Sequence, residues 1–373
     1  DWVLRGGYGI YTSSYNGNIT GSQVIGPPYW TFERQTFTRA SLQRWETAFP
    51  AEPTAFIAPS VTASAYDVRP MKMHEFNVSL QAALPRLRSA ATLSYVGNRG
   101  REMITRVDHN EVAPGLYTNL QAARPYPALG TVRLYENIGL SWYNALQLKI
   151  ERRFERGFGY TFAYSFARNL DEFGASITDV PTPFAPKGYE RGRSQLERRH
   201  VLTVNSIYQL PVGRGRALGA GLHPVANAVI GGWQLSGIYS FTSGEPLSFT
   251  VPGATLGNGF STRPNLVGNP RVSAPSADLW FNPDAFQSPA RYAFGNSGLG
   301  LLDAPGTHLL DLGLLKDFHF AEQRYLQFRW ELFNAPNHVN LNSPNTTLGV
   351  ATTGKILSAG NARQMQFGLK VVF

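Results

Sequence analysis

The sequence contains no cysteine among its 373 residues, which excludes disulfide frameworks, cysteine-based zinc sites and thiol nucleophiles. It also has no apolar run of about 18 residues, so it predicts no transmembrane helix. Charged residues make up only 16% of the chain and aromatic residues 13%. The mean hydropathy is nevertheless -0.21, because the apolar side chains are spread singly along the chain. A membrane-spanning form of this chain would therefore have to be built from strands.

The last twelve residues, Ala362 to Phe373, show the clearest period of two. Met365, Phe367, Leu369, Val371 and Phe373 fall on one face, and polar residues or glycine alternate with them up to Lys370. This alternation predicts a strand with one apolar and one polar face. Such a strand is compatible with the wall of a membrane barrel and also with a soluble sheet.

A hairpin is predicted from Asn144 to Arg168. Its first arm alternates Leu146, Leu148 and Ile150 with polar residues, and its second arm places five aromatic residues in one column from Phe158 to Phe166. The arms join through Glu155-Arg156-Gly157. A column of five aromatics has to be buried or face lipid, since in water it would promote aggregation.

The same alternation recurs along the rest of the chain and predicts roughly ten strands. Their connections alternate in length. Short turns are predicted at Pro85 to Arg88, at Glu155 to Gly157 and at Ala321 to Gln323, and an intermediate connection at Val212 to Gly231, with a short helix from His223 to Val229. Long connections are predicted at Tyr15 to Arg69, Asn98 to Gly139, Asn169 to Glu197, Gly244 to Gly306 and Ala335 to Gly360.

Alternation of short and long connections is typical of outer-membrane barrels, with short periplasmic turns on one side and long extracellular loops on the other. Counting back from Phe373 as a periplasmic end places every short turn on the periplasmic side. A soluble sandwich or propeller would also have many strands, but loops beyond about 15 residues are uncommon in compact domains. We therefore predict an all-β, antiparallel, up-and-down transmembrane β-barrel with long extracellular loops.

Several runs stand out by their order and spacing: Leu4–Gly9, Tyr95–Gly100, Glu197–Val201, Tyr208–Arg216, Gly232–Ile238 with Ser243–Pro246, Trp280–Phe286, Phe294–Gly298, Phe328–His338 and Ala362–Lys370. Together these runs resemble segments of TonB-dependent outer-membrane receptors of the Oar-like type. The sequence departs from that family at Glu197, where the family tends to have Asp, and near Leu299-Gly300, where it tends to have a basic residue followed by Asn.

The resemblance implies that residues 1–373 are the C-terminal part of the barrel, roughly ten of about twenty-two strands, without the N-terminal plug. It implies an outer-membrane location in a diderm bacterium, contact with outer-membrane lipid and lipopolysaccharide, and a TonB complex acting through a plug outside this chain. It also implies that Phe367, Leu369, Val371 and Phe373 signal to the barrel-assembly machinery.

The 34 Lys and Arg residues exceed the 25 Asp and Glu residues, which gives a formal net charge of +9. A basic balance can indicate nucleic-acid binding. Here the basic residues are scattered, with the densest groups at predicted strand ends and loops, such as Arg191 to Arg199. We interpret the excess as contact with lipid phosphates and a water-filled lumen, and predict no nucleic-acid partner.

No enzymatic motif stands out in the sequence. His-Glu-x-x-His and Gly-x-Ser-x-Gly are both missing. His200, which follows Arg198-Arg199 at a strand start, is expected to be interfacial or hydrogen-bonded, not catalytic. We predict no enzyme activity, no metal and no cofactor.

Two groups of residues are candidates for contact with a solute, and each has a structural alternative. Aromatics in long loops can capture a ligand or form small cores that hold the loops together: these are Phe184, Tyr189, Trp280, Phe281, Tyr292 and Phe294. Polar wall residues can face the lumen and contact a solute or neutralise one another: these are Lys149, Glu151, Arg153, Gln327, Arg329, Glu331, Gln366 and Lys370.

The function favoured by these observations is that of a TonB-dependent outer-membrane receptor or transporter barrel that moves a solute across the outer membrane. One alternative is a passive porin-like, structural or adhesin barrel. A second alternative, from another class, is a soluble carbohydrate-binding β protein.

Overall fold

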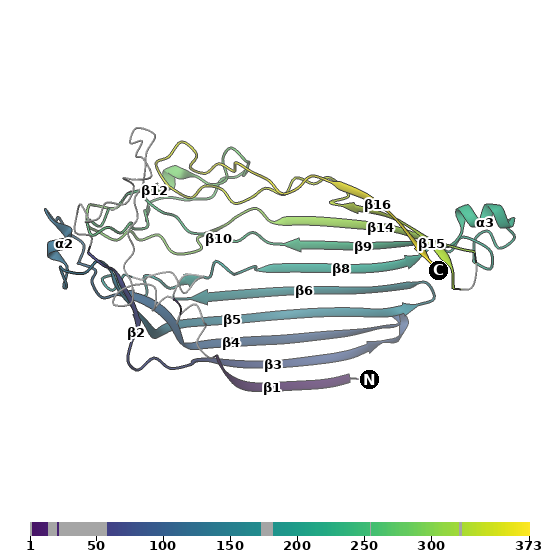
Figure 1. The fold of residues 1–373 in the computed structure, drawn as a ribbon, viewed down its shortest axis with the longest axis horizontal. Coiled ribbons are helices and arrows are strands. Elements are labelled where there is room, and N and C mark those ends of the chain that lie inside the picture. The colour runs from purple at the N-terminus through teal and green to yellow at the C-terminus, as the bar shows by residue number, and fades with distance from the viewer. Residues whose placement is uncertain (1, 14–20, 22–57, 173–181, 254, 321–322) are drawn as a thin grey trace, which may run out of the picture.

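The fold is one large antiparallel sheet with loops gathered at one end (Figure 1). The computed structural model describes residues 2–13, 21, 58–172, 182–253, 255–320 and 323–373. Ten strands lie side by side in chain order. They are β1 (Trp2–Ser13), β3 (Met71–Leu84), β4 (Ser89–Asp108), β5 (Val132–Glu155), β6 (Phe158–Asp171), β8 (His200–Gln209), β9 (Trp233–Thr242), β14 (Thr307–His319), β15 (Tyr325–Phe333) and β16 (Gln364–Val372).

This up-and-down order confirms the predicted antiparallel arrangement and the expected ten strands. Two of the short connections lie where the sequence predicts them. A 3-10 turn, η2 (Pro85–Leu87), ends at Arg88 in the left-handed region and joins β3 to β4. Arg156 and Gly157 join β5 to β6. The predicted turn at Ala321 to Gln323 falls largely on residues 321–322, outside the described residues.

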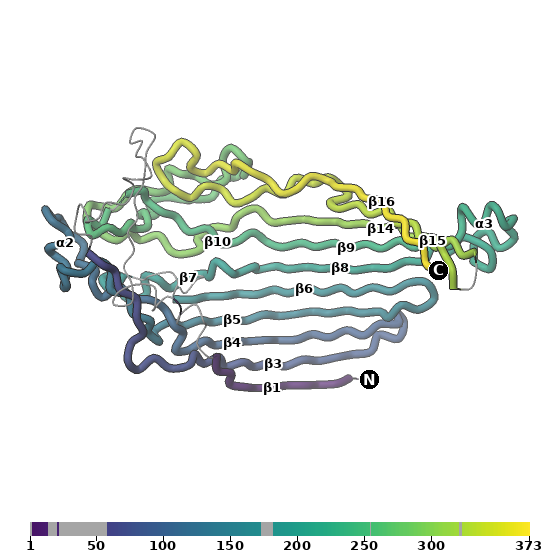
Figure 2. The backbone as a smooth tube through the Cα atoms, viewed as in Figure 1, coloured from purple at the N-terminus to yellow at the C-terminus, as the bar shows by residue number. Residues whose placement is uncertain are grey.

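The connections alternate in length and gather at opposite ends of the sheet, as Figure 2 shows. The short turns and the helix α3 (Pro224–Ile230), predicted from His223 to Val229, lie at one end. Strand β1 begins at this end and β16 ends there, near the marked N- and C-termini. The described parts of the long loops lie at the other end, so the predicted placement of short turns and long loops at opposite ends is confirmed for these connections. The predicted connection Tyr15 to Arg69 falls largely on residues 14–20 and 22–57, outside the described residues.

Two strands extend further than predicted. Asn98 to Gly139 was expected to be a loop, but β4 continues to Asp108, β5 begins at Val132, and the two remain paired with register shifts near Met103. A short strand, β2 (Val61–Ser64), adds parallel pairing to β5 at the same end. The prediction failed because apolar alternation ends where a strand leaves lipid, whereas backbone hydrogen bonds continue to pair the strands in water.

The long loops contain their own short elements and hydrophobic core. Leu247, Phe249, Phe281, Ala285, Phe286, Leu302, Ala304 and Leu348 form a buried cluster there. The remaining elements are α2 (Leu120–Ala123), β7 (Gly192–Arg193), β10 (Pro246–Leu247), β11 (Asn265–Leu266), η3 (Pro283–Ala285), β12 (Phe286–Gln287) and β13 (Leu302–Asp303).

The two faces of the sheet differ in chemistry. Strand register aligns Leu80, Leu93, Leu148, Tyr164 and Leu202 in one row, which we call part of the apolar face. The adjacent row, on the polar face, aligns Thr92, Lys149, Ala163, Thr203 and Ser240. Large apolar side chains are left exposed along the apolar face, as lipid contact requires.

The main sheet is open in the part of the chain that the structure describes. There, β1 pairs with β3 alone and β16 with β15 alone. No helix among the described residues is both long and apolar enough to cross a membrane.

Candidate functional site

The polar face carries the residues predicted to line the lumen. Lys149 and Glu151 lie on β5, and the register places Glu151 in the row of Asp311 on β14. Glu331 of β15 and Gln366 of β16 are aligned with each other in the row of Gly313, two residues after Asp311 on β14. Gln327 with Lys370 and Arg329 with Gly368 continue the same face. Arg153 follows a register irregularity after Arg152, so pairing does not fix its face.

Many of these side chains are paired with their neighbours. Lys149 Nζ lies 2.5 Å from Glu151 Oε2. Arg329 Nε donates to Gln327 Oε1 at 2.6 Å, and Gln366 donates to Glu331. Since these pairs are exposed, each stabilises the fold by no more than about 1 kcal/mol. The wall is therefore hydrophilic but locally neutralised, as the structural alternative expected, and direct solute contact stays a prediction.

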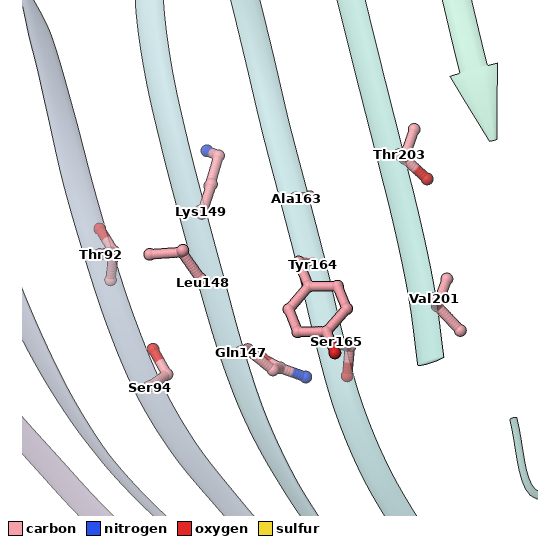
Figure 3. Close-up of a pocket in the computed structure, with 10 residues that line it drawn as sticks. All are labelled: Thr92, Ser94, Gln147, Leu148, Lys149, Ala163, Tyr164, Ser165, Val201 and Thr203. Carbon is pink, nitrogen blue, oxygen red and sulfur yellow. The ribbon is translucent and has the colours of Figure 1, made fainter. Parts of the chain in front are cut away.

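A hollow of about 400 Å³ lies on the polar face (Figure 3). Residues from β4, β5, β6 and β8 line it in two rows that the strand register aligns. One row is Thr92, Lys149, Ala163 and Thr203, and the other is Ser94, Gln147, Ser165 and Val201. The side chains of Ala163, Ser94 and Ser165 are short, which leaves room beside Lys149. The hollow presents hydroxyl groups, one amide and one ammonium, which can hydrogen-bond a hydrophilic molecule. Leu148 and Tyr164 also line it, and most of its surface is apolar.

The loop aromatics separate into buried and accessible groups. Phe281 is completely buried, with its ring centroid 4.9 Å from that of Phe249. Trp280 packs against the same cluster and donates its indole N–H to the Asp303 carbonyl at 2.9 Å. A ring buried in this way offers no surface to a solute, so the structure favours for Phe281 the alternative that it forms part of a small core holding the loops together. Ligand contact by Phe281 and Trp280 stays a prediction.

Tyr189 and Phe294 form a second loop contact, with ring centroids 5.0 Å apart. The Arg263 guanidinium lies over the Tyr189 ring at 3.5 Å. Tyr292 borders a separate loop hollow of about 360 Å³ together with Tyr117 and Arg291. Phe184 is 41% exposed. Contact between these four and a solute remains a prediction.

A buried ion network anchors the loops to the sheet, and the sequence did not predict its role. The Glu197 carboxylate is fully buried and accepts hydrogen bonds from Arg193 Nε at 2.7 Å and from the Asn169 backbone N–H at 2.9 Å. Arg193 also contacts Asp303 at 2.5 Å. Burial disfavours the charged guanidinium, but hydrogen bonds to Asp303 and Glu197 outweigh it and raise the pKa of Arg193. The spacing of Arg193 and Glu197, four residues apart, is the only local signal of this pair.

The predicted assembly signal lies along one face of β16. Phe367, Leu369, Val371 and Phe373 are 58% to 96% exposed. The Phe367 ring stacks on Trp330 at 5.9 Å. Recognition by an assembly machinery stays a prediction.

Among the described residues, no group of three or more His, Asp or Glu side chains is arranged to hold a metal ion. A family model described as "Outer membrane beta barrel domain" matches residues 1–366. None of the curated proteins compared with this chain matches its sequence.

Solved structures of outer-membrane proteins resemble this fold. The transporter YddB from Escherichia coli aligns over 100% of this chain with a TM-score of 0.56 and 11% identity. The ferric-catecholate import receptor Fiu from E. coli K12 aligns over 100% with a TM-score of 0.44 and 10% identity, and the FrpB iron transporter of Neisseria meningitidis (F3-3 variant) over 83% with 0.41 and 12%. This chain spans 38% of YddB and 32% of each of the other two.

Proposed function

This chain belongs to the outer membrane beta barrel domain family, and from that premise we propose that it forms part of the wall of a TonB-dependent transporter. In this proposal it stands in the cell outer membrane and its polar face borders the path of a hydrophilic solute. Family membership excludes the alternative of a soluble carbohydrate-binding protein.

The observation that carries the proposal is the open sheet. Among the described strands, β1 and β16 each have a neighbour on one side only. Bare N–H and C=O groups in hydrocarbon cost several kcal/mol each, so both edges have to be paired in the membrane. We infer that further strands complete a wider barrel, whose lumen has room for a solute and a plug.

Gating is assigned to parts outside residues 1–373. A plug would close the lumen, and a periplasmic TonB protein would pull on it to admit the solute bound by the extracellular loops. The buried loop cluster around Phe249 and the network of Arg193 support this proposal, because they hold the loops in defined positions over the lumen.

The mass and conductance of the native protein test the proposal. We expect protein purified from its source membrane to have an intact mass more than twice the 41.1 kDa of this chain. In planar bilayers it should show no steady conductance, since a plug blocks the lumen. A mature protein near 41.1 kDa, or a steady open channel, would favour a passive porin-like or adhesin barrel instead.

A further inference from the structure

Another hollow, of about 350 Å³, lies on the polar face at the end of the sheet that carries the long loops. Two of its residues, Thr242 at the end of β9 and Thr307 at the start of β14, are aligned by the strand register. Thr242 comes two residues after Ser240 of the polar face, so both threonines belong to that face. We call this the mouth hollow, and the residues that matter for its chemistry are Arg198, Thr242, Glu245, Thr307, Asn342 and Ser343.

The mouth hollow continues the register row that crosses the hollow of Figure 3. In that row Ser165 of β6 pairs with Val201 of β8, which pairs with Thr242 of β9. Val201 lines the hollow of Figure 3, and Thr242 lines the mouth hollow. The two hollows are therefore neighbours along one band of the polar face, and a solute leaving one of them meets the other.

The two charged side chains of the mouth hollow neutralise each other. Arg198 Nη2 lies 3.1 Å from Glu245 Oε2, and Ser343 Oγ donates to Glu245 Oε1. Arg198 Nη1 is also engaged, since it donates to the carbonyls of Gln195 and Glu197 at 2.9 and 2.8 Å. No other charged residue is among the described residues that line the hollow. The hollow offers a charged solute no free counter-charge, and it therefore favours a neutral one.

Hydroxyl and amide groups supply the other polar atoms of the lining. The hydroxyls of Thr242 and Thr307 have no hydrogen-bond partner within the described part of the chain. Asn342 Nδ2 donates to Ser358 Oγ at 2.8 Å, which leaves its amide oxygen to accept. A hydroxyl both donates and accepts, so this set matches a ligand whose own polar groups are uncharged hydroxyls.

Backbone contacts fix the shape of the mouth hollow. The Ala304 N–H donates to the Glu245 carbonyl at 2.8 Å, and a Cβ at Gly244 would overlap the Ala304 carbonyl, so only glycine permits this close approach. Ser243 Oγ accepts from the His200 N–H at 3.0 Å. The polar groups are thus held in place without a ligand, which lowers the entropy cost of binding one.

We propose that the mouth hollow binds a neutral, polyhydroxylated solute, a short carbohydrate, at the entrance to the lumen. Its threonine hydroxyls and the Asn342 amide hydrogen-bond the sugar hydroxyls, and Pro305 and Leu341 of the lining contact the C–H groups of the ring. A peptide matches less well, because its charged termini find no free counter-charge. The inference rests on the proposed function for the path of the solute, but binding itself needs neither a plug nor TonB.

Glycan binding by the native protein in detergent tests the mouth hollow. The probes are an array of neutral gluco-, galacto-, manno- and xylo-oligosaccharides, the same oligosaccharides carrying a uronic acid, and short peptides. We expect wild type to bind neutral oligosaccharides in preference to the other probes. Thr242→Val/Thr307→Val keeps the β-branched shape and removes two hydroxyls. It should weaken this binding, measured by calorimetry, by at least about tenfold, the loss of about two hydrogen bonds.

Thr92→Val/Thr161→Val is the matched control, because it removes two hydroxyls from the polar face outside the mouth hollow. Its affinity for the oligosaccharide should equal that of wild type. Glu245→Gln is a second test variant, which leaves the charge of Arg198 uncompensated. It should shift the preference about tenfold towards the oligosaccharide that carries a uronic acid, a gain that a folding defect would not produce.

Several outcomes would overturn the proposal. They are a wild-type protein that binds no neutral oligosaccharide, one that prefers the acidic oligosaccharides or the peptides, an equal loss of affinity in the control, and an unchanged preference in Glu245→Gln. Because binding is read at equilibrium, each of these results leaves the mass and conductance test of the proposed function standing. Conversely, sugar binding by a protein of about 41.1 kDa with steady conductance would support the mouth hollow and reject active transport.

Discussion

At the scale of single residues, Glu111 connects three loops. It follows β4, is 3% exposed, and its Oε1 accepts hydrogen bonds from Thr182 Oγ1 at 2.5 Å and from Asn258 Nδ2 at 3.0 Å. Burial raises the pKa of Glu111 to about 7; the Thr182 hydrogen bond opposes this and the charge of Asp108 adds to it. Glu111 is thus placed to make the loop contacts sensitive to pH.

We expect the loops to open more easily above neutral pH. The pKa of Glu111 is higher in the folded protein than its unfolded value of 4.5. The stabilisation that the protonated side chain contributes is therefore complete below pH 4.5 and is lost as pH rises through about 7. Over this range the free energy needed to open the loops falls by on the order of 3 kcal/mol. Hydrogen exchange of residues 109–131, corrected for intrinsic rates, should rise between pH 5.5 and 8.5. Glu111→Gln should remove this rise and the exposed Glu155→Gln should keep it; persistence in Glu111→Gln would contradict the assignment.

A second residue-scale prediction concerns the loop core. Phe281 is fully buried against Phe249 and Phe286. Phe281→Ala should lower the unfolding free energy of the loop core by about 3–5 kcal/mol, because it leaves a cavity. Phe281→Leu should lower it by about 1.5 kcal/mol or less. Hydrogen exchange should show the loss in residues 244–306 and little change in β5 and β6. Uniform destabilisation of the whole sheet would show that loops and wall unfold as one unit.

At the scale of elements, the sequence predicts strands well wherever they cross lipid. The hairpin from Asn144 to Arg168 was predicted with its turn, because lipid on one face imposes strict alternation. Outside the membrane that constraint is lost. The sequence therefore did not predict the loop-side ends of β4 and β5 or the short strand β2. It also could not predict which loop aromatics are buried and which are exposed, because that depends on contacts between distant segments.

The β5–β6 turn offers an element-scale test. Arg156 and Gly157 have φ values of 53° and 80°, and positive φ at both central positions is the type I′ geometry. Asn tolerates this region better than Arg, so Arg156→Asn should stabilise the fold by about 0.5 kcal/mol, whereas Gly157→Val should destabilise it by about 1–2 kcal/mol. Denaturant midpoints in detergent micelles measure both. Arg156→Lys is the control, because Lys is no better suited to positive φ than Arg, and its denaturant midpoint should match that of wild type. If Arg156→Asn and Gly157→Val shifted the midpoint in the same direction, the turn assignment would be contradicted.

At the scale of the whole molecule, the fold class, the strand order and the end that carries the loops could be predicted from the sequence. The alternation of short and long connections contains that information, because each hairpin is local in sequence. The way the sheet closes could not be predicted, since closure depends on the partners of β1 and β16. Those edges decide how the polypeptide behaves on its own.

We expect residues 1–373, expressed alone and folded into lipid vesicles, to remain sensitive to protease. The unpaired N–H and C=O groups along β1 and β16 would face hydrocarbon, and that cost favours aggregation or incomplete insertion over a stable open sheet. The native protein, treated in parallel, should resist protease in its strands and resist SDS until boiled. Protease-resistant strands in residues 1–373 alone would mean that β1 and β16 meet. A closed barrel of the ten strands would then follow, too narrow to enclose both a plug and a solute, and active transport through this chain would have to be abandoned.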